Sequence, residues 1–178
     1  IVGDILKFPA IQNPSFALMD IDENRLFESE TIARSLVAQS NSKGTVSIFT
    51  NQRKALENAA FVIVAFQIGG YKPCTVTDFE IPKKYNLQQT IGDTLGIGGI
   101  MRALRTVPHL WLLCEDMLSV CPDAVLLQYV NPMAINTWAI GSKYPTIKQI
   151  GLCHSVQGTV QELARDLRVP SSKIHYQV

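Results

Sequence analysis

The stretch FVIVAFQI, residues 61–68, decides the fold class of this chain. Its residues are apolar almost throughout, so it lacks the alternation of apolar and polar residues that marks a strand with one face in water. A strand of this kind is expected where helices cover both faces of a parallel sheet. The glycine pair Gly69-Gly70 then ends the strand. Residues 61–68 therefore indicate a buried strand in an α/β protein.

Strand-like and helix-like patterns alternate along the rest of the chain. Further strands are expected near residues 15–20, 45–50, 124–130 and 147–152. Apolar residues at helical spacing predict helices over 23–39 and after residue 154, with shorter helices near 53–58 and up to about residue 143. This alternation predicts a doubly wound, Rossmann-like parallel sheet that contains all five strands, with helices on both faces.

Three segments fit the alternation less well. A long irregular segment is expected from Gly69 to about Gly92, followed by a glycine-rich entry into a long helix over 93–118. The final run IHYQV, residues 174–178, has a strand-like pattern. A Rossmann sheet normally begins with a strand and a phosphate-binding glycine turn, and we find neither pattern ahead of residue 15. We therefore expect residues 1–178 to form part of one Rossmann-like domain, truncated at both ends.

The composition argues against several classes of function. Of the 178 residues, 47% are hydrophobic and 17% are charged, as in an ordinary globular protein. The net charge of +1 gives no nucleic-acid footprint, and no apolar run approaches the roughly 20 residues that span a bilayer. The cysteines at 74, 114, 121 and 153 form no CxxC pair. We expect a cytoplasmic protein in a reducing compartment, with a small-molecule partner and neither nucleic acid nor membrane.

Because ligands bind at the carboxyl ends of the strands in open α/β sheets, the residues that end each strand are the candidates for function. Asp20 ends the strand near 15–20. An acidic residue there can accept hydrogen bonds from the ribose hydroxyls of NAD. The alternative is that Asp20 or Asp22 only caps the following helix. Ala65, Phe66, Gln67 and Ile68 end the strand at 61–68, where the backbone either approaches a cofactor or makes an ordinary turn.

Two other strand ends carry polar or reactive side chains. Asn131, followed by Pro132, can offer its amide to a ribose or substrate hydroxyl, or can simply form a turn. Cys153 and His154 follow the strand near 147–152. A thiolate suits a divalent metal ion, and an imidazole is a common acid or base near neutral pH. The alternative is a buried cysteine that only packs, beside a structural histidine.

The remaining histidines offer no clear second metal ligand. His109 is expected inside the long helix, and His175 in the final strand-like run.

Five stretches carry a recognisable pattern in a recognisable order. They are LMDID (18–22), VAFQIGGYKPCTVTDFEIPKKY (64–85), DTLGIGGIMRALRTVP (93–108), NPMAINTW (131–138) and GLCHSVQG (151–158). Together they resemble glycoside hydrolase family four, and most closely its α-galactosidase branch, the melibiases. This family is the NAD-dependent exception to the two-carboxylate scheme of glycosidases.

The resemblance implies an enzyme with a Rossmann domain related to the lactate and malate dehydrogenases. It implies NAD and a divalent metal ion, usually Mn²⁺. The implied reaction on an α-galactoside is oxidation at C3 by NAD, metal-assisted elimination across C2 and C1, addition of water and return of the hydride. A metal ion at the C2 and C3 oxygens would stabilise the negative charge that develops there.

The resemblance also implies roles for single residues. Cys153 matches the metal-binding cysteine, Asn131 the sugar-contacting asparagine and Asp20 the ribose ligand, and residues 65–68 would pass beside the cofactor. His154 stands where relatives of this branch place the candidate acid for the leaving group. The glycine-rich loop, the second metal ligand and the catalytic base would lie outside this chain, so these residues alone are expected to be inactive. The full-length enzyme is expected to form a homo-oligomer.

Other functions share parts of this pattern. Within the family, an α-glucosidase or an α-galacturonidase is the alternative. A 2-hydroxy-acid dehydrogenase would share the fold and Asn131 but has no use for a metal-binding Cys153. An inactive dinucleotide-binding scaffold is the third alternative.

Overall fold

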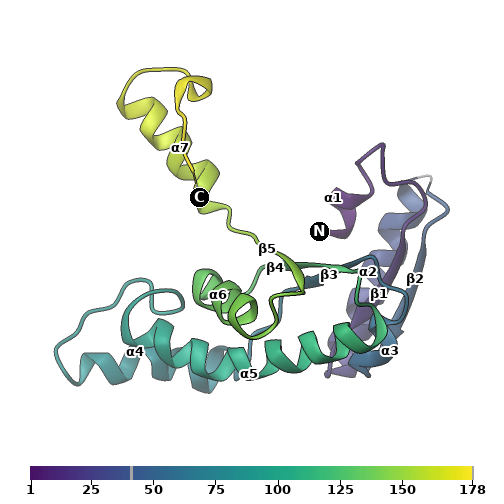
Figure 1. Cartoon of the computed structure of the whole chain (residues 1–178), viewed down its shortest axis with the longest axis horizontal. Helices are drawn as coiled ribbons and strands as arrows, with labels where there is room; N and C mark the ends of the chain where they lie inside the picture. Colours follow the sequence, from purple (N-terminus) through teal and green to yellow (C-terminus); the bar gives the residue numbers. More distant parts are fainter. Residues whose placement is uncertain (41, 178) are drawn as a thin grey trace. The chain divides into compact units, whose positions relative to one another are not determined.

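The computed structural model describes residues 1–40 and 42–177. Helices and strands alternate over most of this length (Figure 1). The chain divides into two compact units. The first comprises Ile1–Val62, Pro108–Val125 and Tyr144–Lys148, and the second comprises Ile63–Val107, Leu126–Lys143 and Gln149–Val178.

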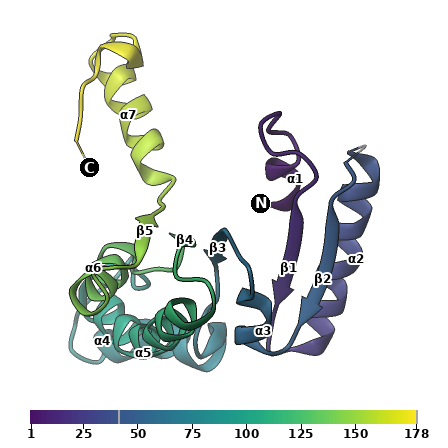
Figure 2. The ribbon, with the colours of Figure 1, turned by 45° about the vertical axis from the view of Figure 1, so that its right-hand side comes forward.

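The first unit contains a two-stranded parallel sheet. Strand β1 (Ser15–Met19) pairs with β2 (Thr45–Phe49) in register, so that Ala17 lies opposite Ser47. Helix α2 (Glu23–Gln39) covers the pair, as Figure 2 shows, and packs Ala33 and Val37 against Val46 of β2. The short helices α1 (Val2–Ile5) and α3 (Gln52–Leu56) complete this part of the unit. Burial of the apolar face of α2 holds the β-α-β arrangement together.

Strands β3 (Phe61–Val64), β4 (Val125–Gln128) and β5 (Lys148–Gly151) form a three-stranded sheet in that order. The Val125 amide donates to the Ala60 carbonyl, and the Tyr129 amide donates to the Val64 carbonyl. Both bonds advance in the same direction along the two strands, so β3 and β4 run parallel. Helix α5 (Gly96–Val120) leads into β4, and α6 (Met133–Lys143) connects β4 to β5.

The α/β class with parallel strands and covering helices is confirmed, but the expected single sheet is instead two sheets. The doubly wound order 3-2-1-4-5-6 gives the physical reason. The order β2-β1 corresponds to places 3 and 2, and β3-β4-β5 corresponds to places 4, 5 and 6. Among residues 1–40 and 42–177, no strand corresponds to place 1, which joins places 2 and 4 in that order, so the strands form two separate sheets.

Two expectations for irregular or terminal segments were wrong. The segment 69–92 contains a π-helical turn (η1, Gly70–Thr75) and helix α4 (Val76–Lys83). Pro73 and Pro82 lie inside these helices, and proline usually signals a break. Residues 174–177 form no strand, so His175 is not in one, and residue 178 lies outside the described residues.

Two more helices follow the expected pattern. The long helix is α5, and His109 lies within it as expected. The chain continues through α7 (Ser155–Asp166) and the short turn η2 (Ser171–Lys173).

Within the described residues, no helix combines the length and the apolar character needed to cross a membrane.

Candidate functional site

Asp20 follows the end of β1 and binds an arginine. Arg25 donates from Nη2 to Oδ1 at 2.7 Å and from Nε to Oδ2 at 3.1 Å, and the Asp22 amide donates to Oδ1 at 2.9 Å. The hydrogen bonds from Arg25 hold the pKa of Asp20 below its usual value. Each carboxylate oxygen can accept about two hydrogen bonds. Arg25 therefore uses part of the hydrogen-bonding capacity of both carboxylate oxygens, and a ribose that binds Asp20 through both oxygens has to compete with Arg25.

The capping role belongs to the neighbouring aspartate. Asp22 is the N-cap of α2, and its side chain accepts hydrogen bonds from the amides of Asn24 and Arg25. Side-chain acceptors are favoured at this position because the first amides of a helix have no partner within it. The helix cap that was the alternative role for Asp20 or Asp22 is therefore Asp22. Asp20 is the carboxylate at the strand end.

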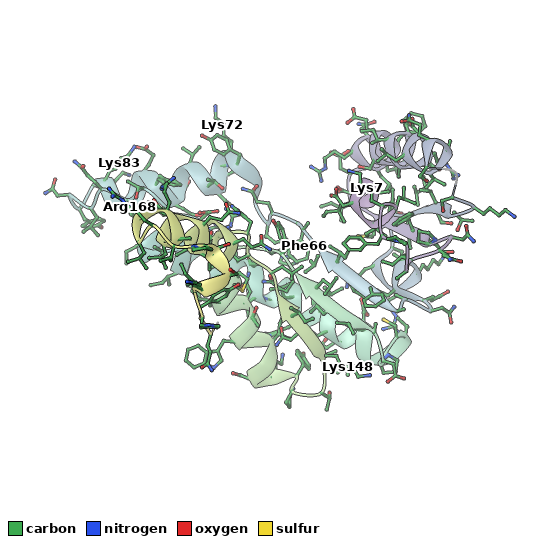
Figure 3. All side chains as sticks on the ribbon, turned by 90° about the horizontal axis from the view of Figure 1, so that it is seen from above. Lys7, Phe66, Lys72, Lys83, Lys148 and Arg168 are labelled. Atoms are coloured by element: carbon green, nitrogen blue, oxygen red, sulfur yellow. The ribbon has the colours of Figure 1, made fainter. Side chains whose placement is uncertain are left out.

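The segment Ala65–Ile68 follows β3 and leads directly into a tight turn. Figure 3 marks this segment by the label of Phe66. Ala65 and Gln67 are exposed, whereas Phe66 and Ile68 are half-buried. Gly69 follows with a φ of 81°, and a Cβ there would lie 2.3 Å from the Cys74 sulfur. A side chain at this position is therefore excluded both by backbone conformation and by space. The glycine lets η1 fold back beside the strand end.

Asn131 follows β4, and its backbone is held by two buried amide side chains. Gln128 donates to the Val130 carbonyl at 2.8 Å and accepts from the Val130 amide at 2.9 Å. Asn136 of α6 donates to the same carbonyl at 3.0 Å. Gln128 and Asn136 have no exposed surface. Because unpaired buried polar groups are costly, these bonds fix the peptide just before Asn131 in place.

The side chain of Asn131 is fixed by a residue that the sequence did not indicate. Its Nδ2 donates to Oδ2 of Asp93 at 3.0 Å. A carboxylate can only accept, so the amide must turn its nitrogen to Asp93. Within residues 1–40 and 42–177 no donor binds its oxygen, which remains able to accept a hydrogen bond. Asp93 stands directly before the glycine-rich entry of α5, which is the one signal that could have drawn attention to it. Its pairing with a residue so distant in sequence could not be anticipated.

Cys153 and His154 lie between β5 and α7. The Leu152 amide donates to the Gln128 carbonyl at 2.8 Å, so the pairing with β4 continues up to Cys153. Hydrogen bonds with the side chain and the amide of Ser155 lower the pKa of the Cys153 thiol. The thiolate is the form that binds metal ions. His154 is exposed and immediately precedes α7.

The sheet order relates these strand ends to one another. β4 and β5 are neighbours, and the Leu152 amide just after β5 donates to the carbonyl of Gln128, the last residue of β4. The two strands therefore end side by side as parallel neighbours, and Asn131 and Cys153 leave the sheet at the same, carboxyl edge. The segment Ala65–Ile68 leaves the sheet at this edge too, because it follows β3, the other neighbour of β4. The sheet thus brings together three of the predicted strand ends, and Asp20 belongs to the other compact unit.

Comparison with known proteins decides the family. Residues 1–169 match the family described as "Family 4 glycosyl hydrolase". The chain belongs to this family. It is 49% identical over 167 residues to an alpha-galactosidase of Bacillus subtilis (strain 168), covering 94% of this chain and 38% of the relative. It is 33% identical over 170 residues to an alpha-galacturonidase of Thermoanaerobacterium saccharolyticum, covering 94% of this chain and 36% of that relative.

A solved glucosidase has the same fold. The 6-phospho-beta glucosidase from Thermotoga maritima, solved with manganese, NAD⁺ and glucose-6-phosphate, superposes with a TM-score of 0.79 at 25% identity. The match covers 96% of this chain and 39% of that chain. The present chain therefore spans somewhat more than a third of the length of these relatives.

The described residues fit these cofactors to different degrees. For NAD, Asp20 offers a half-buried carboxylate at a strand end, and the turn at Gly69 lets the backbone of 65–68 run close to a ligand. For a manganese ion, Cys153 offers one thiolate of lowered pKa. Within the described parts of the chain, no three His, Cys, Asp or Glu side chains gather into a metal site. Cys153 would thus supply one ligand of a site that needs others.

Proposed function

We propose that the chain is part of an NAD- and manganese-dependent α-galactosidase. One observation carries the proposal: a thiol of lowered pKa, Cys153, leaves the sheet at the same edge as Asn131, whose amide oxygen is free to accept a hydrogen bond. A metal ion that binds a sugar needs a ligand such as the Cys153 thiolate, and a hydroxyl of that sugar needs an acceptor such as the Asn131 oxygen. Membership of family 4 and the identity of 49% to an alpha-galactosidase support this choice of reaction and sugar.

Each strand end would have its own role. Asp20 would accept a hydrogen bond from the adenosine ribose, and residues 65–68 would line the cofactor. Cys153 would hold the metal ion, and Asn131 would orient a hydroxyl of the sugar. When bound, NAD would supply reversible oxidation at C3, and the metal ion would supply positive charge beside the C2 and C3 oxygens.

His154 is the candidate acid for the leaving group. Cleavage of the glycosidic bond leaves negative charge on the departing oxygen, so a group that donates a proton there lowers the barrier. The imidazole of His154 is exposed and adjacent to Cys153, so it can reach a sugar bound at the metal ion. It would donate its proton as the bond breaks.

The domain and its setting are also proposals. Residues 1–178 would form part of the NAD-binding domain of an enzyme of full family length. That enzyme would work in the cytoplasm as a homo-oligomer, and a reducing compartment suits the four cysteines, which are all free thiols.

A panel of chromogenic substrates tests the proposal. The full-length enzyme that carries this chain is incubated with p-nitrophenyl α- and β-glycosides, with and without NAD and Mn²⁺. Release of p-nitrophenol from the α-galactoside only when both are present supports the proposal. Hydrolysis that needs neither contradicts it.

The alternatives within the family give different results in the same panel. Preference for the α-glucoside or the α-galacturonide would assign the chain to one of those branches. No turnover of any glycoside, with NAD binding retained, would favour an inactive scaffold. Oxidation of a 2-hydroxy acid in place of hydrolysis would favour a dehydrogenase.

A further inference from the structure

The glycine-rich entry of α5 encloses one polar side chain, that of Gln89. A Cβ at Gly96 would lie 2.8 Å from Oε1 of Gln89, and a Cβ at Gly98 would lie 2.7 Å from its Nε2. A Cβ at Gly92 would lie 3.0 Å from the same nitrogen. Contacts below about 3 Å are not tolerated between packed atoms. Gly96 and Gly98 therefore leave the space that the Gln89 amide fills, and a Cβ at Gly92 would be tight against it.

Gln89 also makes hydrogen bonds to both helices that border this entry. Its Oε1 accepts from the Gly98 amide at 3.1 Å, and its Nε2 lies 3.5 Å from the Asp78 carbonyl of α4. The Gly98 amide is in the first turn of α5, where amides have no partner within the helix. Asp78 in turn is buried and forms an ion pair with Arg105 of α5. Gln89 is thus anchored to a rigid part of this unit.

Asp93 lies inside the segment that Gln89 holds. Gly92 stands directly before Asp93, and Gly98, whose amide binds Gln89, follows it. The Gln89 amide fills the space beside the backbone on both sides of Asp93, where a Cβ at Gly92 or Gly96 would meet it. Asp93 accepts the hydrogen bond from Asn131. A shift of residues 92–98 would therefore move Asp93 and release the amide of Asn131 from its orientation.

We propose that Gln89 is a positioning residue for the sugar site, acting through Asp93 on Asn131. This inference rests on the proposed function, because Asn131 matters here as a sugar ligand. Gln89 does not contact the sugar in this account. Loss of the Gln89 side chain should reduce the affinity for the sugar. It should leave the affinity for NAD unchanged, because residues 65–68, proposed to line the cofactor, do not depend on Gln89. Misplacement of a positioning group by about 1 Å can cost on the order of a hundredfold in rate.

The test compares variants of the full-length enzyme. Gln89→Ala empties the space and removes both bonds, and Gln89→Met fills the space without a strong acceptor. Gln89→Glu keeps an acceptor for the Gly98 amide. Gln88→Ala is the matched control, because Gln88 is the exposed neighbour. Isothermal titration measures the affinities for galactose, with Mn²⁺ and NAD present, and for NAD alone, well below the melting temperature of each variant.

We expect Gln89→Ala and Gln89→Met to weaken galactose binding by about tenfold or more, while NAD affinity stays within about twofold. Gln88→Ala should bind galactose almost as the wild type does. Gln89→Glu, which keeps the bond from the Gly98 amide but cannot donate to the Asp78 carbonyl, should lose less affinity than Gln89→Ala. A purely structural role would lower the melting temperature without changing the sugar affinity of the folded protein. Unchanged galactose affinity in Gln89→Met overturns this inference, as does an equal loss of both affinities. A wild-type enzyme that binds no galactose overturns the proposed function together with it.

Discussion

The side-chain amide of Asn131 donates a hydrogen bond of 3.0 Å to the carboxylate of Asp93. This bond joins the end of β4 to the entry of α5 within one compact unit. It also settles which end of the Asn131 amide is free, because a carboxylate cannot donate. The free oxygen can accept a hydrogen bond from a sugar hydroxyl, and this property underlies the role proposed for Asn131.

The role of Asp20 is tested by NAD binding. Asp20→Ala removes the carboxylate that directly follows β1 and should weaken NAD binding by about 1–3 kcal/mol, the range for a lost hydrogen bond to a charged group. Asp22→Ala is the control. It removes the cap of α2 and should cost about 1 kcal/mol of folding stability without changing NAD affinity. Fluorescence titration measures the affinity. An Asp20→Ala enzyme that binds NAD as the wild type does would refute the assignment.

The reactivity of Cys153 is tested by its pH dependence. Its pKa is lowered by hydrogen bonds with Ser155. The thiolate is the reactive form, so the rate of alkylation by iodoacetamide should rise at a lower pH in the folded protein than in urea. Burial raises the pKa of Cys114 to about 11, so that cysteine should resist alkylation in the folded state. Mass spectrometry of peptides follows each cysteine separately.

A metal ion at Cys153 should change this profile. Mn²⁺ bound to the thiolate in the full-length enzyme should slow its alkylation, and Cys153→Ser should remove both the modification and Mn²⁺-dependent turnover. Equal rates for folded and unfolded Cys153 at every pH would contradict the lowered pKa. Full manganese-dependent hydrolysis by Cys153→Ser would contradict the metal role.

His154 is tested by the choice of leaving group. His154→Ala should leave Mn²⁺ affinity largely intact, because Cys153 is unchanged. It should slow cleavage of alkyl galactosides by roughly 10²–10⁴-fold, the usual contribution of general acid catalysis. It should slow p-nitrophenyl galactoside much less, because p-nitrophenolate departs without a proton. An equal slowing of both substrates would show that His154 is not the acid.

The predicted and unpredicted parts of the structure differ in the range of their interactions. Helix α2 has the bounds 23–39 expected from its apolar spacing, because Leu26, Ala33 and Val37 face the core. The common edge of Asn131 and Cys153 was expected because both residues follow strands of a parallel sheet. The contact of Asp93 with Asn131 did not, because it joins a loop to a strand end 38 residues away.

Two other features of the structure were not predicted, helix α4 and the separation of β1 from β3. Helix α4 was hidden by Pro82, which lies inside it although proline usually breaks a helix. The separation of β1 from β3 could not be read from their apolar patterns, because both strands look alike whether or not they pair directly.

The buried support of Asn131 is tested by stability. Asn136→Ala leaves the Val130 carbonyl with one bond fewer and opens space in the core, since Asn136 is fully buried. We expect a loss of about 1–3 kcal/mol in the free energy of unfolding. Thr159→Ala on the exposed side of α7 is the control and should change it by less than about 0.5 kcal/mol. Urea unfolding measures both, and equal stabilities would show that the Asn136 bond contributes nothing.

Hydrolysis in D₂O tests the central claim most directly. If the enzyme removes the C2 proton of the sugar and later returns one from solvent, galactose released from an α-galactoside should carry deuterium at C2. Nuclear magnetic resonance of the product detects this exchange at a single carbon. A glycosidase that displaces the leaving group directly never breaks the C2–H bond. We predict deuterium at C2 whenever NAD and Mn²⁺ support turnover, and galactose released without deuterium at C2 would contradict the account.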